Sequence, residues 1–204
     1  MFEQSLTKNT KNILAILGKE KILKDAYLAG GTALALQLGH RISYDLDFFT
    51  NKPFERKEII QQIEPLGFKL EKEAWRTIMG KFLNIKFSLF YYKYPLIFKT
   101  KDFLGINIAD IKDIATMKID AISSRGTKRD FVDLYFLTKQ ISLKEMLKFY
   151  EKKYKLLRAN KAHILKSLDY FVDADKETEP KMLAKDYSWS KVKEFLKKET
   201  IKLI

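Results

Sequence analysis

The sequence contains no cysteine and only two histidines among its 204 residues. The absence of cysteine excludes a disulfide-stapled scaffold, a zinc site with thiolate ligands and a cysteine nucleophile. Two histidines are too few for a histidine-rich metal centre. Any metal bound by this chain is therefore expected to have carboxylate ligands.

Long apolar runs are absent as well. No segment approaches the roughly 18 uninterrupted apolar residues that a membrane-spanning helix needs. Residues 1–12 lack the basic start and apolar run of a signal peptide. We therefore expect a cytoplasmic protein with no membrane partner. With 46% hydrophobic residues the chain can bury a core, and its length suits one domain or two small ones.

Positive charge is present in excess. The chain has 39 lysine and arginine residues against 26 aspartate and glutamate residues, a formal net charge of +13. This balance favours an anionic partner such as RNA, DNA or a nucleotide. Most of the excess lies in residues 53–100 and 141–204, which carry +4 and +6. Lysines on helices usually form only a solvated face, so the charge indicates a class of partner and locates no site.

The pattern of apolar residues predicts a mixed α/β region followed by helices. Helical periodicity is expected over residues 11–24, 32–38, 55–63, 110–125, 128–139, 159–172 and 190–203. We therefore expect an α+β fold with two regions, a core over residues 1–100 and a helical region over residues 101–204.

Other local signals refine this plan. Ser142-x-x-Glu145 has the form of a capping box and opens a helix to about Leu157. Alternating residues predict a strand over residues 45–50. Residues 68–94 are rich in aromatic and β-branched residues and are expected to form β-structure, with a turn near Gly80.

Residues 28–50, LAGGTALALQLGHRISYDLDFFT, combine two features that suit a phosphate ligand and a metal. A short strand ends in Gly30 and Gly31, followed by Thr32 and a helix. Glycines let a backbone approach a ligand, and a helix N-terminus offers N–H groups to phosphate. Asp45 and Asp47 alternate on a strand, so their carboxylates point the same way. Such a pair is unfavourable without a cation between the two charges, and Mg²⁺ prefers oxygen ligands of this kind.

Two further side chains precede the acids. Arg41 can neutralise phosphate or hold the acids in place, and Ser43 adds a hydroxyl. His40 has no second histidine nearby and is interpreted as structural or as a weak phosphate contact. Each feature alone also suits a tight turn or a surface acid. Together, a phosphate cradle and a carboxylate pair are what nucleotidyl transfer requires.

These residues carry a resemblance. Gly31-Thr32, then twelve residues, then Asp45-Leu46-Asp47 resembles the G-S…DxD signature of polymerase β-like nucleotidyltransferases, with threonine in place of serine. The string GGTALAL-x-x-GHRIS-x-DLDFF is more closely similar to the AbiEii/AbiGii toxin branch. A second block, KIDAISSRGTKRDFVDLYFL over residues 118–137, resembles the family's lysine and R-D-x-x-D-L-Y-F-L string. The resemblance spans roughly residues 26–140.

The resemblance implies a polymerase β-like nucleotidyltransferase core, a mixed sheet with helices, followed by a C-terminal helical bundle. It implies a metal-dependent toxin of toxin–antitoxin or phage-defence systems, which transfers an NMP from an NTP to an acceptor such as tRNA and has a cognate antitoxin. The implied catalytic residues are Asp45, Asp47, Lys118 and Asp130, and Asp45 and Asp47 would hold Mg²⁺. The implied nucleotide-binding residues are Gly30, Gly31, Thr32, Arg41, Ser43 and Lys118.

The second block leaves several roles open. Lys118 would bind the triphosphate as a point charge. Asp130 could orient a lysine, bind a metal or act as a general base. Alternatively, Asp130, Asp133 and the neighbouring cations form only a surface ion-pair network, since Arg129 and Asp133 are four residues apart.

One departure from the pattern concerns a third carboxylate. Many polymerase β-like enzymes carry it on a later strand, yet no Asp or Glu lies between Glu73 and Asp102, where Lys86 and Ser88 stand instead. Either two carboxylates and substrate hold the metal, or Asp130 substitutes, or the site is weak. A degenerate module that binds nucleotide, RNA or a partner protein therefore stays open. So does an aminoglycoside-modifying nucleotidyltransferase, against which the basic balance argues.

Overall fold

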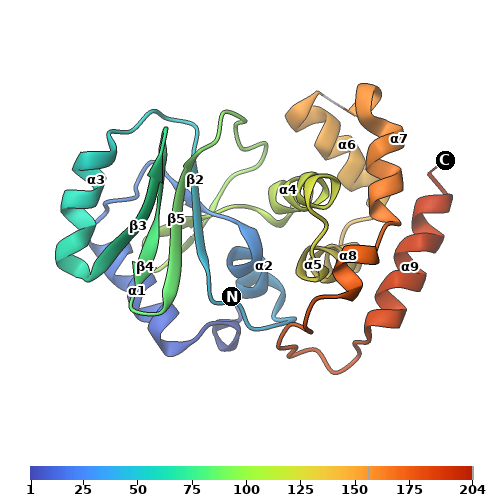
Figure 1. Ribbon diagram of the computed structural model, residues 1–204, viewed down its shortest axis with the longest axis horizontal. Coiled ribbons are helices and arrows are strands. Elements are labelled where there is room, and N and C mark those ends of the chain that lie inside the picture. The colour runs from blue at the N-terminus through green and yellow to red at the C-terminus, as the bar shows by residue number, and fades with distance from the viewer. Residues whose placement is uncertain (156, 204) are drawn as a thin grey trace. The chain divides into compact units, whose positions relative to one another are not determined.

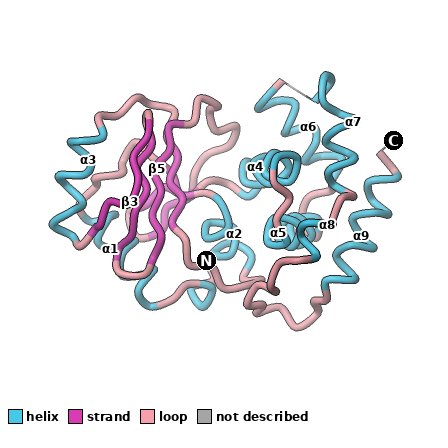
Figure 2. The backbone as a smooth tube through the Cα atoms, viewed as in Figure 1, coloured by secondary structure: helices cyan, strands magenta, loops and turns pink. Residues whose placement is uncertain are grey.

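The computed structural model describes residues 1–155 and 157–203. The chain divides into two compact units (Figure 1). The first comprises Met1–Pro95 and Lys99–Asp110, and the second comprises Leu96–Phe98 and the chain from Ile111 onward. Figure 2 shows strands in the first unit and helices in the second. The expected α+β class is confirmed. Among the described residues, no helix is both long and apolar enough to cross a bilayer.

The first unit is built on a mixed seven-stranded sheet of order β3-β4-β5-β2-β1-β7-β6. The strand pairs β2–β5 and β1–β7 are parallel, and the other neighbours are antiparallel. The strands are β1 (Tyr27–Leu28), β2 (Leu46–Thr50), β3 (Phe68–Ala74), β4 (Thr77–Phe82), β5 (Ile85–Tyr91), β6 (Lys101–Phe103) and β7 (Ile106–Ile108).

Strand β2 has one face of buried apolar side chains and an opposite face that bears Asp47. Leu46 and Phe48 are fully buried and pair in register with Phe87 and Leu89 of β5, so both strands bury apolar side chains on one side. Asp47 lies between them on the opposite side and is only partly buried. The alternation of the sequence therefore places the acid on the less covered face of a strand whose other face is core.

The helices of the first unit follow from similar patterns. Thr7 caps α1 by accepting a hydrogen bond from the Thr10 N–H, and α1 buries an apolar stripe. Helix α2 is apolar nearly all round and is largely buried. The helices are α1 (Lys8–Lys19), α2 (Gly30–Leu38) and α3 (Arg56–Ile63), with short 3₁₀ turns over Glu3–Ser5 and Glu64–Leu66.

The second unit is helical. Its helices are α4 (Ile111–Ser124), α5 (Lys128–Thr138), α6 (Leu143–Tyr154), α7 (Leu157–Leu168), α8 (Val172–Asp175) and α9 (Trp189–Ile201). The predicted capping box at Ser142 and Glu145 is confirmed at the start of α6.

A buried ion pair attaches the segment Leu96–Phe98 to these helices. Lys153 Nζ of α6 lies 2.7 Å from Asp113 Oδ1 of α4, and neither side chain is exposed. The Asp113 carboxylate also accepts backbone N–H bonds from Ile97 and Phe98 at 2.9–3.1 Å. Because the carboxylate is charge-paired and fully hydrogen-bonded, it can be buried here without a large penalty.

The structure corrects several boundaries. Gly80 lies inside β4, and the chain reverses at residues 75–76 and 83–84 instead. A Cβ on Gly80 would collide with the Lys69 carbonyl and the Phe68 ring, so this glycine allows close strand packing and makes no turn. Strands β6 and β7 carry the sheet past residue 100, to Ile108.

The helix boundaries differ as well. Helix α6 ends at Tyr154, before the expected Leu157, and α7 ends at Leu168 with a separate short helix after it. Helix α2 already begins at Gly30, so both glycines belong to its first turn.

Candidate functional site

The start of α2 lies directly against β2. The Ala29 N–H donates to the Asp47 carbonyl at 3.0 Å, and α2 begins at the next residue. Gly30 has a φ of +67°, and a Cβ there would lie 3.0 Å from Asp47 Oδ2. Residue 29 is an alanine and provides no side-chain cap. The N–H groups of the first turn of α2 therefore open next to the Asp47 carboxylate.

Hydrogen bonds from Thr32 connect the first turn of α2 to residues 43–45. The buried Thr32 hydroxyl donates to the Asp45 carbonyl and lies 2.9 Å from Ser43 Oγ. The Ser43 N–H in turn donates to the Ser5 carbonyl at 3.0 Å. Both hydroxyls therefore contribute to positioning Asp45, and the N–H of Thr32 is the group left to face a phosphate.

Arg41 packs against the glycine of the same turn. Its side chain is almost fully buried, with 3% of the residue exposed, and Nη1 donates to the Ile42 carbonyl at 3.1 Å. A Cβ on Gly31 would collide with Nη2 of this guanidinium. Glycine at position 31 thus allows the Arg41 guanidinium to lie beside the N-terminus of α2. The positive charge and the helix N-terminus each favour a negative ligand. His40, 2% exposed, is buried next to Arg41 in the chain.

Asp45 and Asp47 are both partly buried; Asp47 lies on the strand face described above, and Asp45 immediately precedes β2. The register of β2 and β5 sets Ser88 directly opposite Asp47, at the place where an acid would complete a triad. In the part of the chain that the structure describes, no three His, Cys, Asp or Glu side chains form a metal-sized group. The oxygen donors on this face are therefore two carboxylates and a largely buried serine hydroxyl.

Lys118 of α4 is held by two acids of α5. Its Nζ lies 2.9 Å from Asp130 Oδ1 and 2.6 Å from Asp133 Oδ2, and all three side chains are nearly or fully buried. Asp130 further accepts a 2.7 Å bond from the Thr127 hydroxyl and a 3.0 Å bond from Arg125 Nε. The second block of the sequence thus forms one hydrogen-bonded ion cluster in the second unit.

This cluster determines the protonation of Asp130. Burial by itself would raise the pKa of its carboxyl, but the charge of Lys118 and the bonds from Arg125 and Thr127 hold the pKa well below its usual value. A carboxylate that is this acidic and this fully hydrogen-bonded is a poor general base. Among the roles left open for Asp130, the geometry favours orienting Lys118.

The structure therefore brings the predicted residues together in two groups. Gly30, Gly31, Thr32, Arg41, Ser43, Asp45 and Asp47 lie together in the first unit, and Lys118 and Asp130 lie together in the second. The interpretation from sequence missed Thr127 as a partner of Asp130. Its spacing three residues before an acid, at a helix start, is the signal that indicates it.

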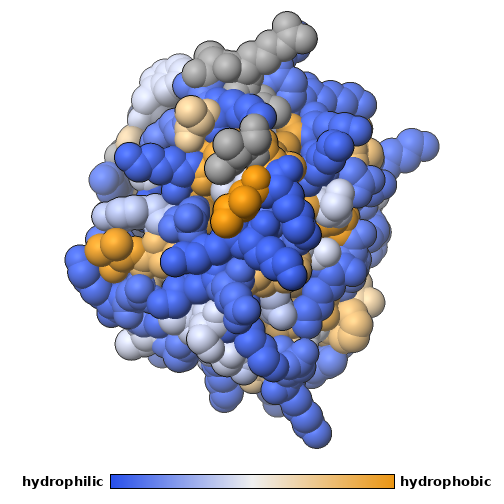
Figure 3. All heavy atoms as spheres, turned by 90° about the vertical axis from the view of Figure 1, so that its right-hand side faces the viewer, coloured by the Kyte–Doolittle hydropathy of each residue, from blue (hydrophilic) through white to orange (hydrophobic). Residues whose placement is uncertain are grey.

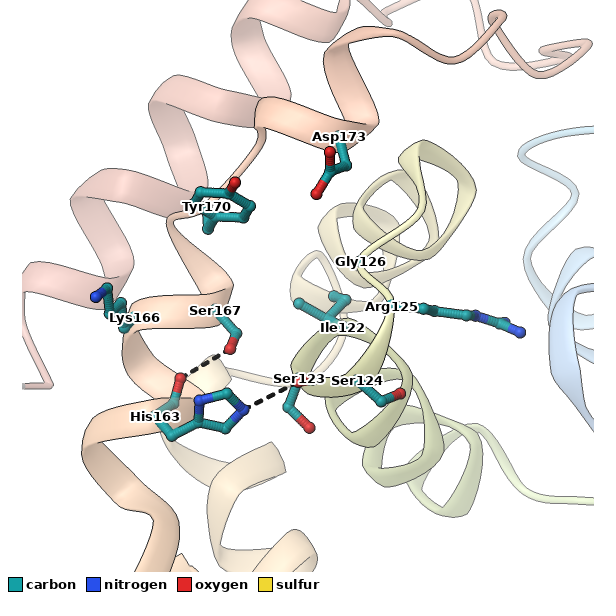
Figure 4. A pocket seen from close by; sticks show the side chains of 10 residues that line it. All are labelled: Ile122, Ser123, Ser124, Arg125, Gly126, His163, Lys166, Ser167, Tyr170 and Asp173. Carbon is teal, nitrogen blue, oxygen red and sulfur yellow. Dashed lines mark hydrogen bonds between the residues drawn. The ribbon is translucent and has the colours of Figure 1, made fainter.

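A separate pocket of about 330 Å³ lies within the second unit. His163, Ser167, Tyr170 and Asp173 line it from one side (Figure 4). His163 Nε2 lies 3.0 Å from the Ser123 carbonyl. Figure 4 shows the Arg125 side chain extending away from this pocket. With Arg125 turned outward and Asp173 in its wall, the pocket is a poor match for a triphosphate.

The chain is similar in sequence to a known family and to a curated protein. A family model described as nucleotidyl transferase AbiEii toxin, type IV toxin–antitoxin system, matches residues 12–85. The uncharacterized protein aq_aa25 of Aquifex aeolicus (strain VF5) is 41% identical over 208 residues, which cover 96% of each chain.

Two solved structures share the fold. JHP933 from Helicobacter pylori has a TM-score of 0.54 at 21% identity, covering 97% of this chain and 93% of that one. MenT4, a nucleotidyltransferase toxin from Mycobacterium tuberculosis H37Rv, has a TM-score of 0.52 at 15% identity, covering 94% of this chain and 82% of that one.

The fold is thus that of the nucleotidyltransferases, with a C-terminal helical region added. Residues 12–85 match the AbiEii nucleotidyltransferase toxin family, and the whole chain belongs to the same family as aq_aa25.

Proposed function

We propose that this protein is a metal-dependent nucleotidyltransferase that moves an NMP from an NTP to an acceptor, with tRNA as the expected acceptor. One observation carries the proposal. The uncapped N-terminus of α2, with Arg41 packed beside it, opens next to the Asp47 carboxylate. A site for anionic phosphate and a pair of carboxylates therefore lie side by side, as nucleotidyl transfer requires.

The donor set on this face suits Mg²⁺. This ion is usually bound by one or two carboxylates, with substrate phosphates and water completing six oxygen ligands. Asp45 and Asp47 supply the two carboxylates. Ser88, opposite Asp47, offers a hydroxyl where relatives with a third acid would offer a charge. Bound there, the ion would neutralise phosphate charge and polarise the reacting oxygens.

The residues of this chain then have definite tasks. The N–H groups of Gly31 and Thr32 bind the phosphates of the NTP, and the Thr32 hydroxyl donates to the main-chain carbonyl of Asp45 and so holds that residue in position. An oxygen of the acceptor hydroxyl forms a bond to the α-phosphorus while the bond to the bridging oxygen breaks. Pyrophosphate leaves with that electron pair, and the hydroxyl proton passes to water.

Lys118 is proposed to bind the triphosphate, as the resemblance implies, and Asp130 to act as its positioning residue. The ion cluster supports a positioning role for Asp130, because its bond and that of Asp133 restrict the rotation of the Lys118 side chain. The net charge of +13 supports RNA as the acceptor. A cognate antitoxin and a cytoplasmic location are proposed from the family alone.

The decisive experiment is an NTP-transfer assay with each labelled NTP, Mg²⁺ and total cell RNA. Asp47→Asn preserves the size of the side chain and removes its charge, so labelling is expected to fall by at least roughly 100-fold. Asp45→Asn should behave alike. Asp25→Asn is the matched control, since Asp25 forms an exposed ion pair with Lys52 and should keep full activity. Undiminished labelling by Asp47→Asn would show that the site is misplaced.

A second candidate is a nucleotide-, RNA- or partner-binding module without turnover. Ser88 in place of a third acid is the observation that favours it. Mg²⁺-dependent NTP binding that is lost in Asp47→Asn, with no label transferred to any RNA or protein, would support the module over the enzyme.

A further inference from the structure

The tip of the β3–β4 hairpin and the end of β5 together form a stack of three side chains, of which Trp75 is exposed and Arg76 and Tyr91 are half-buried. Ala74 and Thr77 form the last pair, which leaves Trp75 and Arg76 to make the turn. The Arg76 guanidinium carbon lies 4.6 Å from the centre of the Trp75 ring and 4.7 Å from that of Tyr91. Trp75 is 75% exposed. We call Trp75, Arg76 and Tyr91 the hairpin ledge.

The ledge contradicts ordinary turn chemistry. Two-residue hairpin turns favour Asn-Gly or Asp-Gly, because such turns need left-handed backbone that glycine adopts without strain. Here Arg76 adopts a φ of +49°. A tryptophan left in water also forgoes the largest gain from burial that any side chain offers.

The ledge is held in place by the backbone around it. The Tyr91 N–H donates to the Arg76 carbonyl at 3.0 Å. Arg56 of α3 donates to the Ala74 carbonyl at 3.0 Å. Because the turn is pinned on both sides, the aromatic faces are ordered before any partner arrives, which lowers the entropy cost of binding.

The chemistry of the ledge favours single-stranded nucleic acid. Exposed aromatic rings offer flat faces on which bases stack, and a guanidinium adds both stacking and attraction to phosphate. Residues 53–100, which include the hairpin, have nine basic and five acidic residues. A protein partner would also use Trp, Tyr and Arg, but it gains less from a surplus of one charge.

The ledge lies at the C-terminal end of β2, the strand that carries Asp47. Thr50 of β2 pairs with Tyr91 of β5, so Tyr91 lies three residues beyond Asp47 along the strand direction, about 10 Å, and one strand to the side. Strand alternation places Tyr91 on the core face of the sheet, opposite to Asp47. On the face of Asp47, the Phe49 ring, two residues further along β2, contacts the Tyr92 ring at 5.5 Å between centroids.

We propose that the hairpin ledge binds the unpaired strand of the acceptor RNA by stacking bases on Trp75 next to Arg76. This identification of the ligand as an acceptor rests on the proposed function. Binding itself does not require transfer, so the two can be tested apart.

The test measures binding of a 5′-fluorescein-labelled single-stranded RNA 12-mer by fluorescence anisotropy, without NTP and in the Asp47→Asn background. Trp75→Leu should weaken binding by about 5- to 100-fold, the usual effect of losing one stacked base. Trp75→Phe keeps a ring and should retain most of the affinity. For a duplex of the same sequence, Trp75→Leu should reduce the affinity much less, because paired bases are not free to stack on the tryptophan ring.

Two further variants separate binding from folding. Arg76→Gly relieves the left-handed residue, so it should weaken RNA binding while leaving the melting temperature undiminished. Leu83→Ala is the matched control, because Leu83 is 73% exposed with a φ of +52° at the neighbouring hairpin tip. It should bind RNA as the parent does.

If Trp75→Leu and Arg76→Gly both bind RNA as tightly as the parent protein does, the proposal is overturned, and a protein partner becomes the better explanation of the ledge. Trp75-dependent binding by a protein that never transfers a nucleotide would instead support the ledge and contradict the proposed transferase.

Discussion

Single residues of the α2 turn have separable tasks. Gly31 makes room for a buried guanidinium, whereas Gly30 supplies left-handed backbone directly against the Asp47 carboxylate. Both positions require the absence of a Cβ atom, but for different reasons. A side chain at position 31 meets Arg41, and one at position 30 combines backbone strain with a close approach to Asp47.

Gly30→Ala is expected to reduce transfer by roughly 100-fold, because a shift of about 1 Å in a reacting group has effects of that size. Gly67→Ala is the matched control. Gly67 has a φ of +94° and nothing within 4 Å of an added Cβ. Both variants should lose about 1 kcal/mol of stability through left-handed strain. Measured by thermal unfolding and NTP transfer, equal activity in the two variants would contradict the role given to Gly30.

At the scale of elements, the ion cluster joins α4 to α5. Asp130 lies in the first turn of α5, where Thr127 caps the helix, and it reaches back to Lys118 in the middle of α4. Helices α4 and α5 are thereby connected by buried charge as well as by apolar packing. The cluster should therefore contribute to stability in a way that depends on pH.

Asp130→Asn is expected to lower the free energy of unfolding by about 2–3 kcal/mol at neutral pH, since charged hydrogen bonds are lost while Lys118 keeps Asp133. The pKa of Asp130 is lowered in the folded state from its usual 3.8. Its contribution is thus present above about pH 4 and is lost as the pH falls further.

Denaturant unfolding at several pH values checks this. The difference in unfolding free energy between wild type and Asp130→Asn should narrow progressively as the pH falls below about 4. Asp169→Asn, an exposed acid of the same unit, should leave the curve unchanged. A gap that stays constant with pH would show that Asp130 acts through packing alone.

For the whole molecule, the question is what the surplus charge does. Figure 3 shows a face over the C-terminal helices that is mostly hydrophilic, with scattered hydrophobic side chains. Lys197 and Lys198 of α9 are exposed, and the described part of the chain shows no ion pair for either. Such lysines form either a solvated face or a surface for RNA backbone.

Salt dependence distinguishes these alternatives. If the lysines contact RNA, replacing both Lys197 and Lys198 by glutamine should reduce the slope of log affinity against log salt by about 1.4, at about 0.7 per phosphate of single-stranded RNA. The anisotropy assay described for the ledge provides the measurement. Lys191→Gln is the control, because Lys191 already pairs with Asp186. An unchanged slope would identify the two lysines as solvated surface.

Much of the local structure was accessible from sequence. The alternation of Asp45, Leu46, Asp47 and Phe48 predicted a strand with its acids on one side, and the capping box predicted the start of α6. Gly80 was misinterpreted because a glycine required by a neighbouring strand looks the same, in sequence, as one required by a turn. The hairpin ledge was missed for a similar reason, since Arg76 and Tyr91 meet only when β4 and β5 pair.

The sequence by itself determined the resemblance to AbiEii toxins, the α+β class and the residue types of the α2–β2 segment, because those depend on short-range patterns and on residue types in fixed order. Only the tertiary structure decided that Ser88 stands opposite Asp47, that Lys153 is buried against Asp113, and that Asp130 is committed to Lys118 and Arg125. These pairings join residues on different elements. Strand register and helix packing bring them together, and both are set by burial of the whole core.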